Sequence, residues 1–447
     1  MNWFFTKRFS RSLLAIGTCL LVLLSAQAPN VASAPKSPLE KQLNPPALFK
    51  KSGKTPKKSS AQQKAAEAKA KAAKAKAEAE KKASEPLFPT LRPPEEIRGV
   101  WLTNNDMTVL KDRRKLGTVM NKLSQLKFNT LYPVIWNSGY VTYPSQVAKK
   151  AGIQPFVYRG TEGQDILADV IAQGRRQKML VIPWFEFGFM APQTSELAIN
   201  HPDWLTQQRN GKQTSISAAG EVAWLNPFRP EVQKFITDLV VEAVSNYDVD
   251  GIQFDDHMSL PYTFGYDPYT VALYKKEMKK DPPTNPKDAA WTKWRADKLT
   301  EFMVKLKQEI RQRKPNAIVS VSPNYAAYAY KFQLQDWHTW VKKGVVDELI
   351  VQVYRSDLRS FKHTIMRSEM VEARKKIPTA VGILTGLRRR PVPLKQVQSQ
   401  VYAANERGMG TVFFYLESLW SEGPESPDAR QSGLKYLFPR TALRPRS

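Results

Sequence analysis

The sequence predicts an α/β fold, a (β/α)8 TIM barrel over residues 95–440, preceded by a signal peptide and a low-complexity Ala/Lys/Glu linker. Eight runs rich in β-branched and aromatic residues recur along this stretch, and helical patterns separate them. Strands that alternate with helices form parallel sheets, and eight such units close into a barrel.

The eight predicted strands are 97–103, 128–136, 179–187, 250–256, 317–323, 347–354, 378–384 and 410–417. Helical patterns occupy 112–127, 164–177, 229–247, 295–314, 363–375, 394–407 and 427–436. The two longest connections, 188–228 and 257–292, follow the third and fourth strands. Both therefore lie at the C-terminal end of the barrel, where barrel enzymes place their active sites.

The N-terminus has the features of a secretory signal peptide, ending at residue 28 or 34. Basic residues precede an apolar run at 13–24, and small-residue triplets follow it. The run is shorter than the roughly 20 residues that span a bilayer, although an uncleaved anchor stays the alternative. We therefore expect an exported protein, in the periplasm, in the cell envelope or secreted. The single cysteine, Cys19, lies in this segment, which excludes a disulfide framework and a Cys-rich zinc site.

Residues 35–94 form a basic linker whose core, 61–84, is almost entirely Ala, Lys and Glu. It has no Leu, Ile, Val or aromatic residue for a coiled-coil seam, which predicts a solvated helix or spacer. Electrostatic attachment to an acidic wall polymer or a membrane surface is the functional alternative. Residues 1–94 hold 18 Lys and Arg against 5 Asp and Glu, so +13 of the net +27 lies there and +14 in the remaining 353 residues.

A short basic tail, 441–447, ends the chain. Net charge alone is a weak sign of nucleic-acid binding, and we expect none. The basic balance instead favours attraction to an acidic envelope polymer. The sequence does not indicate the oligomeric state.

Side chains of a barrel strand alternate between the lumen and the helices. In the fourth strand, Gln253 and Asp255 are expected inward, Ile252 and Phe254 outward, and Asp256 at the strand end. The other inward sets near strand ends are Trp184 and Glu186; Ser320, Ser322 and Asn324; Gln352 and Tyr354; and Tyr415 and Glu417. Any one of these residues could equally be a helix cap or a loop residue, but together they indicate a polar ligand site.

Four carboxylates are the catalytic candidates: Asp255, Asp256, Glu186 and Glu417. Glycosidic cleavage needs an acid for the leaving oxygen and a second carboxylate that attacks or activates water. The third and fourth strands are neighbours, so Glu186 and an Asp of the fourth could approach to about 5–6 Å, as in retaining enzymes. Glu417 lies on the eighth strand, and its pairing with Asp255 predicts a wider, inverting separation. Both alternatives remain open.

Aromatic residues at strand ends offer flat apolar faces with polar tips, which suit a sugar ring, although ordinary packing is the alternative for many of them. The candidate substrate-binding residues are Trp101, Asn104, Trp136, Trp184, Asn226, Gln253, His257, Asn324, Gln352, Tyr354 and Tyr415.

Other chemistries have less support. The sequence has no phosphate-binding loop, no G-x-S-x-G elbow and no H-E-x-x-H motif. Asp255, Asp256 and His257 could form half of a metal site, but the other three histidines are scattered. We therefore expect no metal and no cofactor.

Several motifs resemble the glycosyl-hydrolase-like 10 family of barrel proteins over about residues 95–420. The matching segments are 98–101 (RGVW), 128–132 (FNTLY), 184–186 (WFE), 224–227 (WLNP), 247–256 (YDVDGIQFDD), 320–323 (SVSP) and 352–354 (QVY). His257 stands where the family usually has Tyr. The resemblance implies a glycosidase barrel in which Asp255, Asp256 and Glu186 are catalytic. It also implies envelope or extracellular glycans as substrates, peptidoglycan strands among them.

The leading hypothesis is an exported glycoside hydrolase that cleaves O-glycosidic bonds of such a polysaccharide. The main alternative is a non-catalytic glycan-binding or wall-attached barrel. A de-N-acetylase or amidase on the same polymer is a third, weaker alternative.

Overall fold

The computed structural model describes residues 60–84, 94–154, 163–217 and 220–445, which fall into two compact units. Helix α1 (Ser60–Ser84) belongs to one unit and the barrel to the other. The described side chains of α1, at 67–78, are all exposed, because Ala, Lys and Glu give it no apolar face. No helix within the described ranges is long and apolar enough to cross a bilayer. The predicted signal peptide lies outside these ranges.

Parallel strands close into the predicted barrel, because β1 pairs with both β2 and β15. The barrel strands are β1 (Arg98–Leu102), β2 (Thr130–Asn137), β4 (Leu180–Val181) with β5 (Trp184–Phe185), β9 (Gly251–Asp255), β10 (Ile318–Ser322), β11 (Glu348–Gln352), β12 (Thr379–Leu384) and β15 (Gly410–Phe414). The (β/α)8 prediction is confirmed. The third strand is interrupted at 182–183, where Pro183 has no N–H to donate to the sheet.

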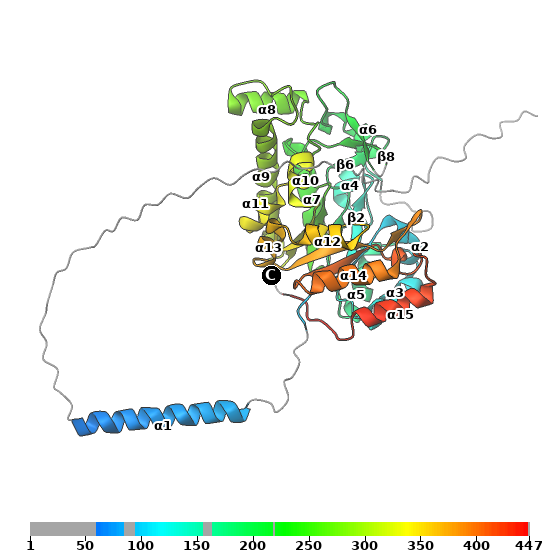
Figure 1. Ribbon diagram of the computed structural model, residues 1–447. Helices are drawn as coiled ribbons and strands as arrows, with labels where there is room; N and C mark the ends of the chain where they lie inside the picture. The colour runs from blue at the N-terminus through cyan, green and yellow to red at the C-terminus, as the bar shows by residue number, and fades with distance from the viewer. Residues whose placement is uncertain (1–59, 85–93, 155–162, 218–219, 446–447) are drawn as a thin grey trace, which may run out of the picture. The chain divides into compact units, whose positions relative to one another are not determined.

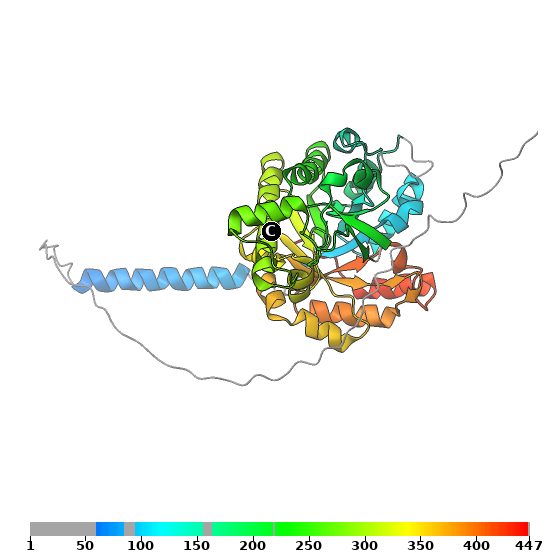
Figure 2. The same cartoon turned by 90° about the horizontal axis from the view of Figure 1, so that it is seen from above.

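Helices surround the strands, as the view from above shows (Figure 2). Several begin at an Asp that accepts a backbone hydrogen bond, such as Asp112 before α3 and Asp165 before α5. The helices of the barrel unit are α2 (Met107–Leu110), α3 (Arg113–Gln125), α4 (Gln146–Lys150), α5 (Ile166–Arg176), α6 (Glu196–Asn200), α7 (Pro230–Asn246), α8 (Pro268–Met278), α9 (Ala289–Arg313), α10 (Ala326–Gln333), α11 (Trp337–Lys342), α12 (Leu358–Ile365), α13 (Ser368–Arg374), α14 (Leu394–Asn405) and α15 (Pro427–Leu437). Short 3-10 turns add Asn104–Asp106, Pro202–Trp204 and Glu417–Leu419.

The long connections carry small elements of their own (Figure 1). After β5, the strands β6 (Met190–Pro192), β7 (Thr214–Ser217) and β8 (Gly220–Trp224) form an antiparallel sheet. The connection after β9 contains α8. Two short hairpins complete the set: β3 (Tyr140–Val141) pairs with the end of β2, and β13 (Gly386–Leu387) pairs with β14 (Arg390–Pro391).

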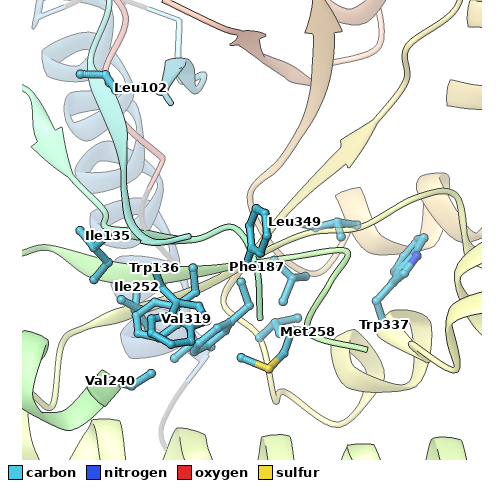
Figure 3. Close-up of a cluster of buried hydrophobic side chains, with 14 of the residues drawn as sticks. Leu102, Ile135, Trp136, Phe187, Val240, Ile252, Met258, Val319, Trp337 and Leu349 are labelled. Atoms are coloured by element: carbon cyan, nitrogen blue, oxygen red, sulfur yellow. The ribbon is translucent and has the colours of Figure 1, made fainter. Parts of the chain in front are cut away.

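Apolar side chains form two layers, one outside and one inside the strands. Ile252 and Phe254 belong to the outer layer between strands and helices, as the alternation predicts. Figure 3 shows Ile252 there with Trp136 of β2 and Val240 of α7. The inner layer fills the lumen with Ile97, Trp101, Tyr132, Val134, Ile182, Trp184, Ile350, Ala380 and Val412. The lumen is thus a packed core, as in other barrels of this kind.

An ion pair lies at the N-terminal end of the lumen. Glu348, the first residue of β11, is only 1% exposed and pairs with Arg444. Its Oε1 accepts hydrogen bonds from the hydroxyls of Tyr132 and Ser320, both at 2.8 Å. The carboxylate therefore has a cation and two hydroxyl donors, which compensate for its removal from water.

The C-terminal segment supplies that arginine. The backbone N–H of Leu443 donates to Pro94, and its carbonyl accepts from Glu96. Residues 441–445 of the predicted basic tail therefore dock on the N-terminal end of the barrel, next to the start of β1.

Candidate active site

Glu186 and Asp255 come from the ends of neighbouring strands. β5 and β9 are parallel, and their register pairs Trp184 with Gln253 and Phe185 with Phe254. The next residue along each strand is Glu186 and Asp255, respectively. Two carboxyl groups from different strands thus lie side by side at the C-terminal end of the barrel.

Gly188 allows the two loops that carry these carboxyls to approach closely. A Cβ on Gly188 would lie 2.3 Å from the carbonyl oxygen of His257, and its φ of +49° is in the left-handed region. The adjacent Phe189 N–H donates to the same carbonyl at 3.1 Å. The segment after β5 is therefore held against the segment after β9, and only glycine fits at the contact.

Asp255 is 4% exposed and is oriented by two strands beyond its own. Its Oδ1 accepts from the Ser322 hydroxyl at 2.9 Å and from the Gln352 amide at 2.6 Å. Gln335 donates to its main-chain oxygen at 3.0 Å. Oδ2 lies on the other side, 3.7 Å from Nδ1 of His257.

Asp256 accepts from Asn324, which lies just before helix α10, and from Gln333, the last residue of that helix. Asn324 and Gln333 both donate side-chain amide hydrogens to its Oδ2, at 2.8 Å each. Its Oδ1 lies 3.5 Å from Nδ1 of His257. The imidazole thus faces both aspartates, and the same nitrogen lies 2.9 Å from the carbonyl oxygen of Glu186. We call Glu186, Asp255, Asp256 and His257 the carboxylate cluster.

Burial and the neighbouring charges shift the pKa values within the carboxylate cluster. Burial, with a smaller repulsion from Asp255, raises the pKa of Glu186 to about 8. Burial and the adjacent Asp256 raise the pKa of Asp255 to about 6. Burial alone would lower the pKa of His257, but attraction to Asp256 and Asp255 outweighs it and raises that pKa to about 10. Near neutral pH, Glu186 is therefore mainly protonated, Asp255 mainly ionised and His257 positively charged.

The carboxyl groups of the cluster have side-chain amides and an imidazole as partners, where a buried carboxylate with a purely structural role would usually have an arginine or lysine. In the described part of the chain, no Arg or Lys pairs with Glu186, Asp255 or Asp256. The Nδ2 of Asn137, at the end of β2, donates to Oε2 of Glu186. A protonated acid beside an ionised carboxylate is the arrangement that general acid catalysis with a carboxylate partner requires.

Asp255, Asp256 and His257 also offer three potential metal ligands within 4.8 Å of one another. Their hydrogen bonds favour a different use. Nδ1 of His257 faces the Glu186 carbonyl at donor distance and therefore carries a proton. One oxygen of each aspartate already accepts from side-chain amides. The cluster is arranged around a protonated imidazole.

Three predicted ligand residues lie beneath the carboxylates, inside the lumen. Trp101 donates its indole N–H to Gln253 at 2.6 Å, and Gln253 in turn donates to Ser320. The ring centroids of Trp101 and Trp184 are 6.1 Å apart. All three predicted residues are at most 2% exposed, so they support the cluster from below and do not offer a face to a ligand.

Trp136 and Asn226 are corrections to the predicted ligand set. Trp136 is fully buried in the outer apolar layer (Figure 3). Its indole N–H donates to the carbonyl of Gly188 at 2.9 Å. Trp136 lies near the end of β2, which suggested a ligand contact, but its side chain points toward the helices and not into the lumen. Asn226 is also fully buried, and it bonds to Asp267, Thr270 and the backbone of Phe228. It organises the loop before α7.

The eighth strand ends in a separate group. Glu417 pairs with Arg388 at 3.3 Å, and its Oε2 accepts from the Tyr415 hydroxyl at 3.3 Å. Its backbone N–H donates to the buried Asp106, whose pKa is raised to about 7 chiefly by burial. The structure gives Glu417 no hydrogen bond to the carboxylate cluster among the described residues.

The remaining predicted ligand residues lie at the C-terminal end of the barrel. Gln352 and Asn324 bond to the aspartates, and His257 lies between them. Tyr354, two residues beyond Gln352, contacts the ring of Phe414. Asn104 lies half-buried in the turn after β1.

Known proteins resemble this chain in sequence and in fold. The sequence profile of the family described as "Glycosyl hydrolase-like 10" matches residues 96–404. The chain belongs to this family.

Curated relatives include the glycosyl hydrolase DigH of Escherichia coli (strain K12), 23% identical over 320 residues that cover 61% of this chain and 68% of that protein. The glycosyl hydrolase YngK of Bacillus subtilis (strain 168) is 21% identical over 306 residues, covering 61% of this chain and 57% of YngK. Among solved structures, the fold is similar to that of the PgaB (BpsB) glycoside hydrolase domain from Bordetella bronchiseptica, with a TM-score of 0.58 and 15% sequence identity. The match covers 79% of this chain and 100% of that one. The β-amylase catalytic domain from Paenibacillus polymyxa gives a TM-score of 0.54 at 9% identity, covering 77% and 98%.

Sequence reasoning missed three polar residues that hold this end of the barrel, Asn137, Asp106 and Gln333. Asn137 ends β2, so the rule that found Ser322 and Gln352 at the ends of their strands could have found it. Asp106 follows β1 and bonds to the turns after β1 and β15. Gln333 lies at the end of α10, where no pattern in the sequence indicated a contact with Asp256.

Proposed function

We propose that this glycosyl hydrolase-like 10 barrel is an exported glycoside hydrolase that cleaves O-glycosidic bonds of an envelope or extracellular polysaccharide, and that peptidoglycan glycan strands are its substrate. The observation that carries the proposal is the pair Glu186 and Asp255, neighbours at two strand ends with pKa values of about 8 and about 6. The two values lie on opposite sides of neutrality, which supports Glu186 as the acid and Asp255 as its carboxylate partner in this proposal.

In this proposal Glu186 donates its proton to the glycosidic oxygen as the bond to the leaving sugar breaks. Asp255 attacks the anomeric carbon through Oδ2, because Oδ1 is held by Ser322 and Gln352. Glu186 then removes a proton from the water that releases the second sugar. Adjacent strands favour the short separation, about 5–5.5 Å, of retaining enzymes.

Asp256 and His257 position the nucleophile. The charged imidazole lies 3.7 Å from Asp255 and 3.5 Å from Asp256, so it reduces the repulsion between the two aspartates. Asn324 and Gln333 fix the orientation of Asp256. The charge on Asp255 is thereby kept available near neutral pH without a permanent ion pair to an arginine or lysine.

The test is hydrolysis by the purified protein. Incubation with peptidoglycan glycan strands should release new reducing ends, and Asp255→Asn and Glu186→Gln should each abolish the release. Asp238→Asn, a half-exposed aspartate on the outer helix α7, is the matched control and should retain activity. NMR of the first product should show the anomer of the substrate.

Equal behaviour of wild type and both variants would refute catalysis by these carboxylates. Strand binding without turnover would instead support a non-catalytic glycan-binding barrel. Release of acetate or peptide without new reducing ends, abolished by a chelator, would instead point to a metal-dependent de-N-acetylase or amidase.

Export belongs to the same proposal. It is supported by the basic start, the apolar run and the small-residue triplets of residues 1–34. Cell fractionation should find the protein outside the cytoplasm, and sequencing of its N-terminus should begin after residue 28 or 34. A cytoplasmic protein that begins at Met1 would contradict export.

A further inference from the structure

Four aromatic rings lie in a row at the C-terminal end of the barrel. The ring centroids of Tyr325 and Tyr328 are 5.8 Å apart, those of Tyr328 and Phe332 5.1 Å, and those of Phe332 and Tyr262 5.6 Å. Tyr325 precedes α10, Tyr328 and Phe332 lie on it, and Tyr262 comes from the loop after β9. We call Tyr325, Tyr328, Phe332 and Tyr262 the aromatic row.

The aromatic row is continuous with the carboxylate cluster. Tyr325 directly follows Asn324, and Phe332 directly precedes Gln333, the two residues that bond to Asp256. The backbone N–H of Tyr262 donates to the carbonyl of Phe332 at 3.0 Å. The same hydrogen bonds that orient Asp256 therefore fix the position of the rings.

Two rings of the row remain accessible. Tyr328 and Phe332 are each 38% exposed, and they are neighbours on one side of α10. Contiguous exposed apolar surface often marks a binding site, whereas single exposed apolar residues need no explanation. Flat rings next to a candidate glycosidase site offer the faces on which sugar rings stack.

Cations border the aromatic row. Nζ of Lys287 lies 5.3 Å from the ring centroid of Tyr262 and 5.9 Å from that of Phe332. At the other end, Arg355 lies 5.6 Å from the ring of Tyr325. No ion pair among the described residues involves Lys287 or Arg355, and the guanidinium of Arg355 donates to the carbonyl of Tyr354 at 3.4 Å. The charge of both side chains can therefore attract a negatively charged ligand.

We propose that the aromatic row, with Lys287 and Arg355, binds a stretch of anionic polysaccharide beyond the sugars that are cleaved. The chain would stack sugar faces on Tyr328 and Phe332 and place its carboxylates near the two cations. This binding proposal rests on the proposed function in one respect: the polysaccharide bound on the aromatic row is taken to extend to Asp255 and Glu186, where it is cleaved. It adds that the ligand is a polymer longer than the reacting pair of sugars, and that its charge contributes to binding.

Binding to an inactive protein tests the surface without any dependence on cleavage. The full chain with Glu186→Gln is titrated with peptide-free peptidoglycan glycan strands, whose muramic acid residues carry free carboxylates. A second titration uses the same strands after chemical reduction of those carboxylates. Tyr328→Ala with Phe332→Ala in this background should weaken binding of native strands about tenfold or more, and reduced strands should bind several-fold more weakly than native ones.

The control is Tyr402→Ala with Tyr436→Ala, two exposed tyrosines on α14 and α15, which should leave the affinity unchanged. Melting temperatures check that each variant is folded. Unchanged affinity of the Tyr328/Phe332 variant, or equal affinity for native and reduced strands, would overturn the proposal. If wild type binds strands through these rings but releases no reducing ends, the surface stands and the proposed hydrolysis fails.

Discussion

The lumen holds a buried carboxylate group at each end, and the two are compensated differently. At the N-terminal end, Glu348 has Arg444 and two hydroxyl donors. At the C-terminal end, Glu186 and Asp255 have amides, a serine and an imidazole, and the pKa values of both are raised. A permanent cation makes a buried carboxylate a structural element, whereas carboxylates held by amides, a hydroxyl and a titratable imidazole can exchange protons. The difference separates the stabilising end of the barrel from the end expected to react.

The largest expected effect is on activity at the C-terminal end. Glu186→Gln should lower kcat on glycan strands about 10²–10⁴-fold, the range for loss of a general acid. Its stability at pH 8 should equal or exceed that of wild type, because the glutamine no longer carries a buried charge. Steady-state kinetics and urea unfolding at pH 8 measure the two effects. A variant that is both inactive and clearly destabilised would show that Glu186 is structural, as Glu348 is.

The opposite result is expected at the N-terminal end. Arg444→Ala should cost about 3–5 kcal/mol of unfolding free energy, because it leaves Glu348 buried without a cation. The kcat at low temperature should change little. Arg113→Ala is the control: it breaks an ion pair in which the arginine is 71% exposed, and it should cost at most about 1 kcal/mol. Equal costs for the two variants would contradict the assignment of Arg444.

The pH dependence of activity should test the roles of the carboxyls at the C-terminal end. Activity requires Asp255 ionised and Glu186 protonated, so kcat/KM should be bell-shaped between about pH 6 and about pH 8. It should fall about tenfold per pH unit outside this range. Both pKa values are raised above their unfolded values, so the native state binds the extra protons and these two groups lower stability as the pH rises. An activity that keeps rising above pH 9 would exclude Glu186 as the acid.

The smallest effect is expected for Glu417, which the sequence alone ranked with the other acids. Because it pairs with Arg388 in a partly exposed position, Glu417→Gln should change kcat less than about tenfold and stability by less than about 1 kcal/mol. The same kinetic and unfolding measurements apply. A loss as large as that of Glu186→Gln would place the acid on the eighth strand and favour the inverting alternative.

The barrel and the inward carboxylates could be predicted because strand alternation depends on local periodicity. Gln253 and Asp255 point inward and Ile252 outward for that reason. Trp136 shows where the rule fails: its place at a strand end was recognised, but not the side it faces. The sequence also does not show how deep a side chain lies within the lumen, so Trp101 was expected to contact a ligand although it is buried.

Long-range contacts could not be read from the sequence. Gln333 and Arg444 are separated from their carboxylate partners by 77 and 96 residues, and no periodicity reports such pairings. The aromatic row depends on α10, which was not among the helical segments predicted from the sequence. Its rings only become neighbours when that helix forms and the loop after β9 docks against it.

The backbone hydrogen bonds between Leu443 and residues 94 and 96 bring together the first and last residues of the barrel segment of the chain. The barrel can therefore be expected to close whichever strand comes first in the chain. A circular permutant could join residue 445 to residue 94 through a short linker and open the chain at Gly344, a turn on the side away from the carboxylates. Such a protein would keep every strand pairing, and its new termini would lie at the end of the barrel opposite the carboxylate cluster.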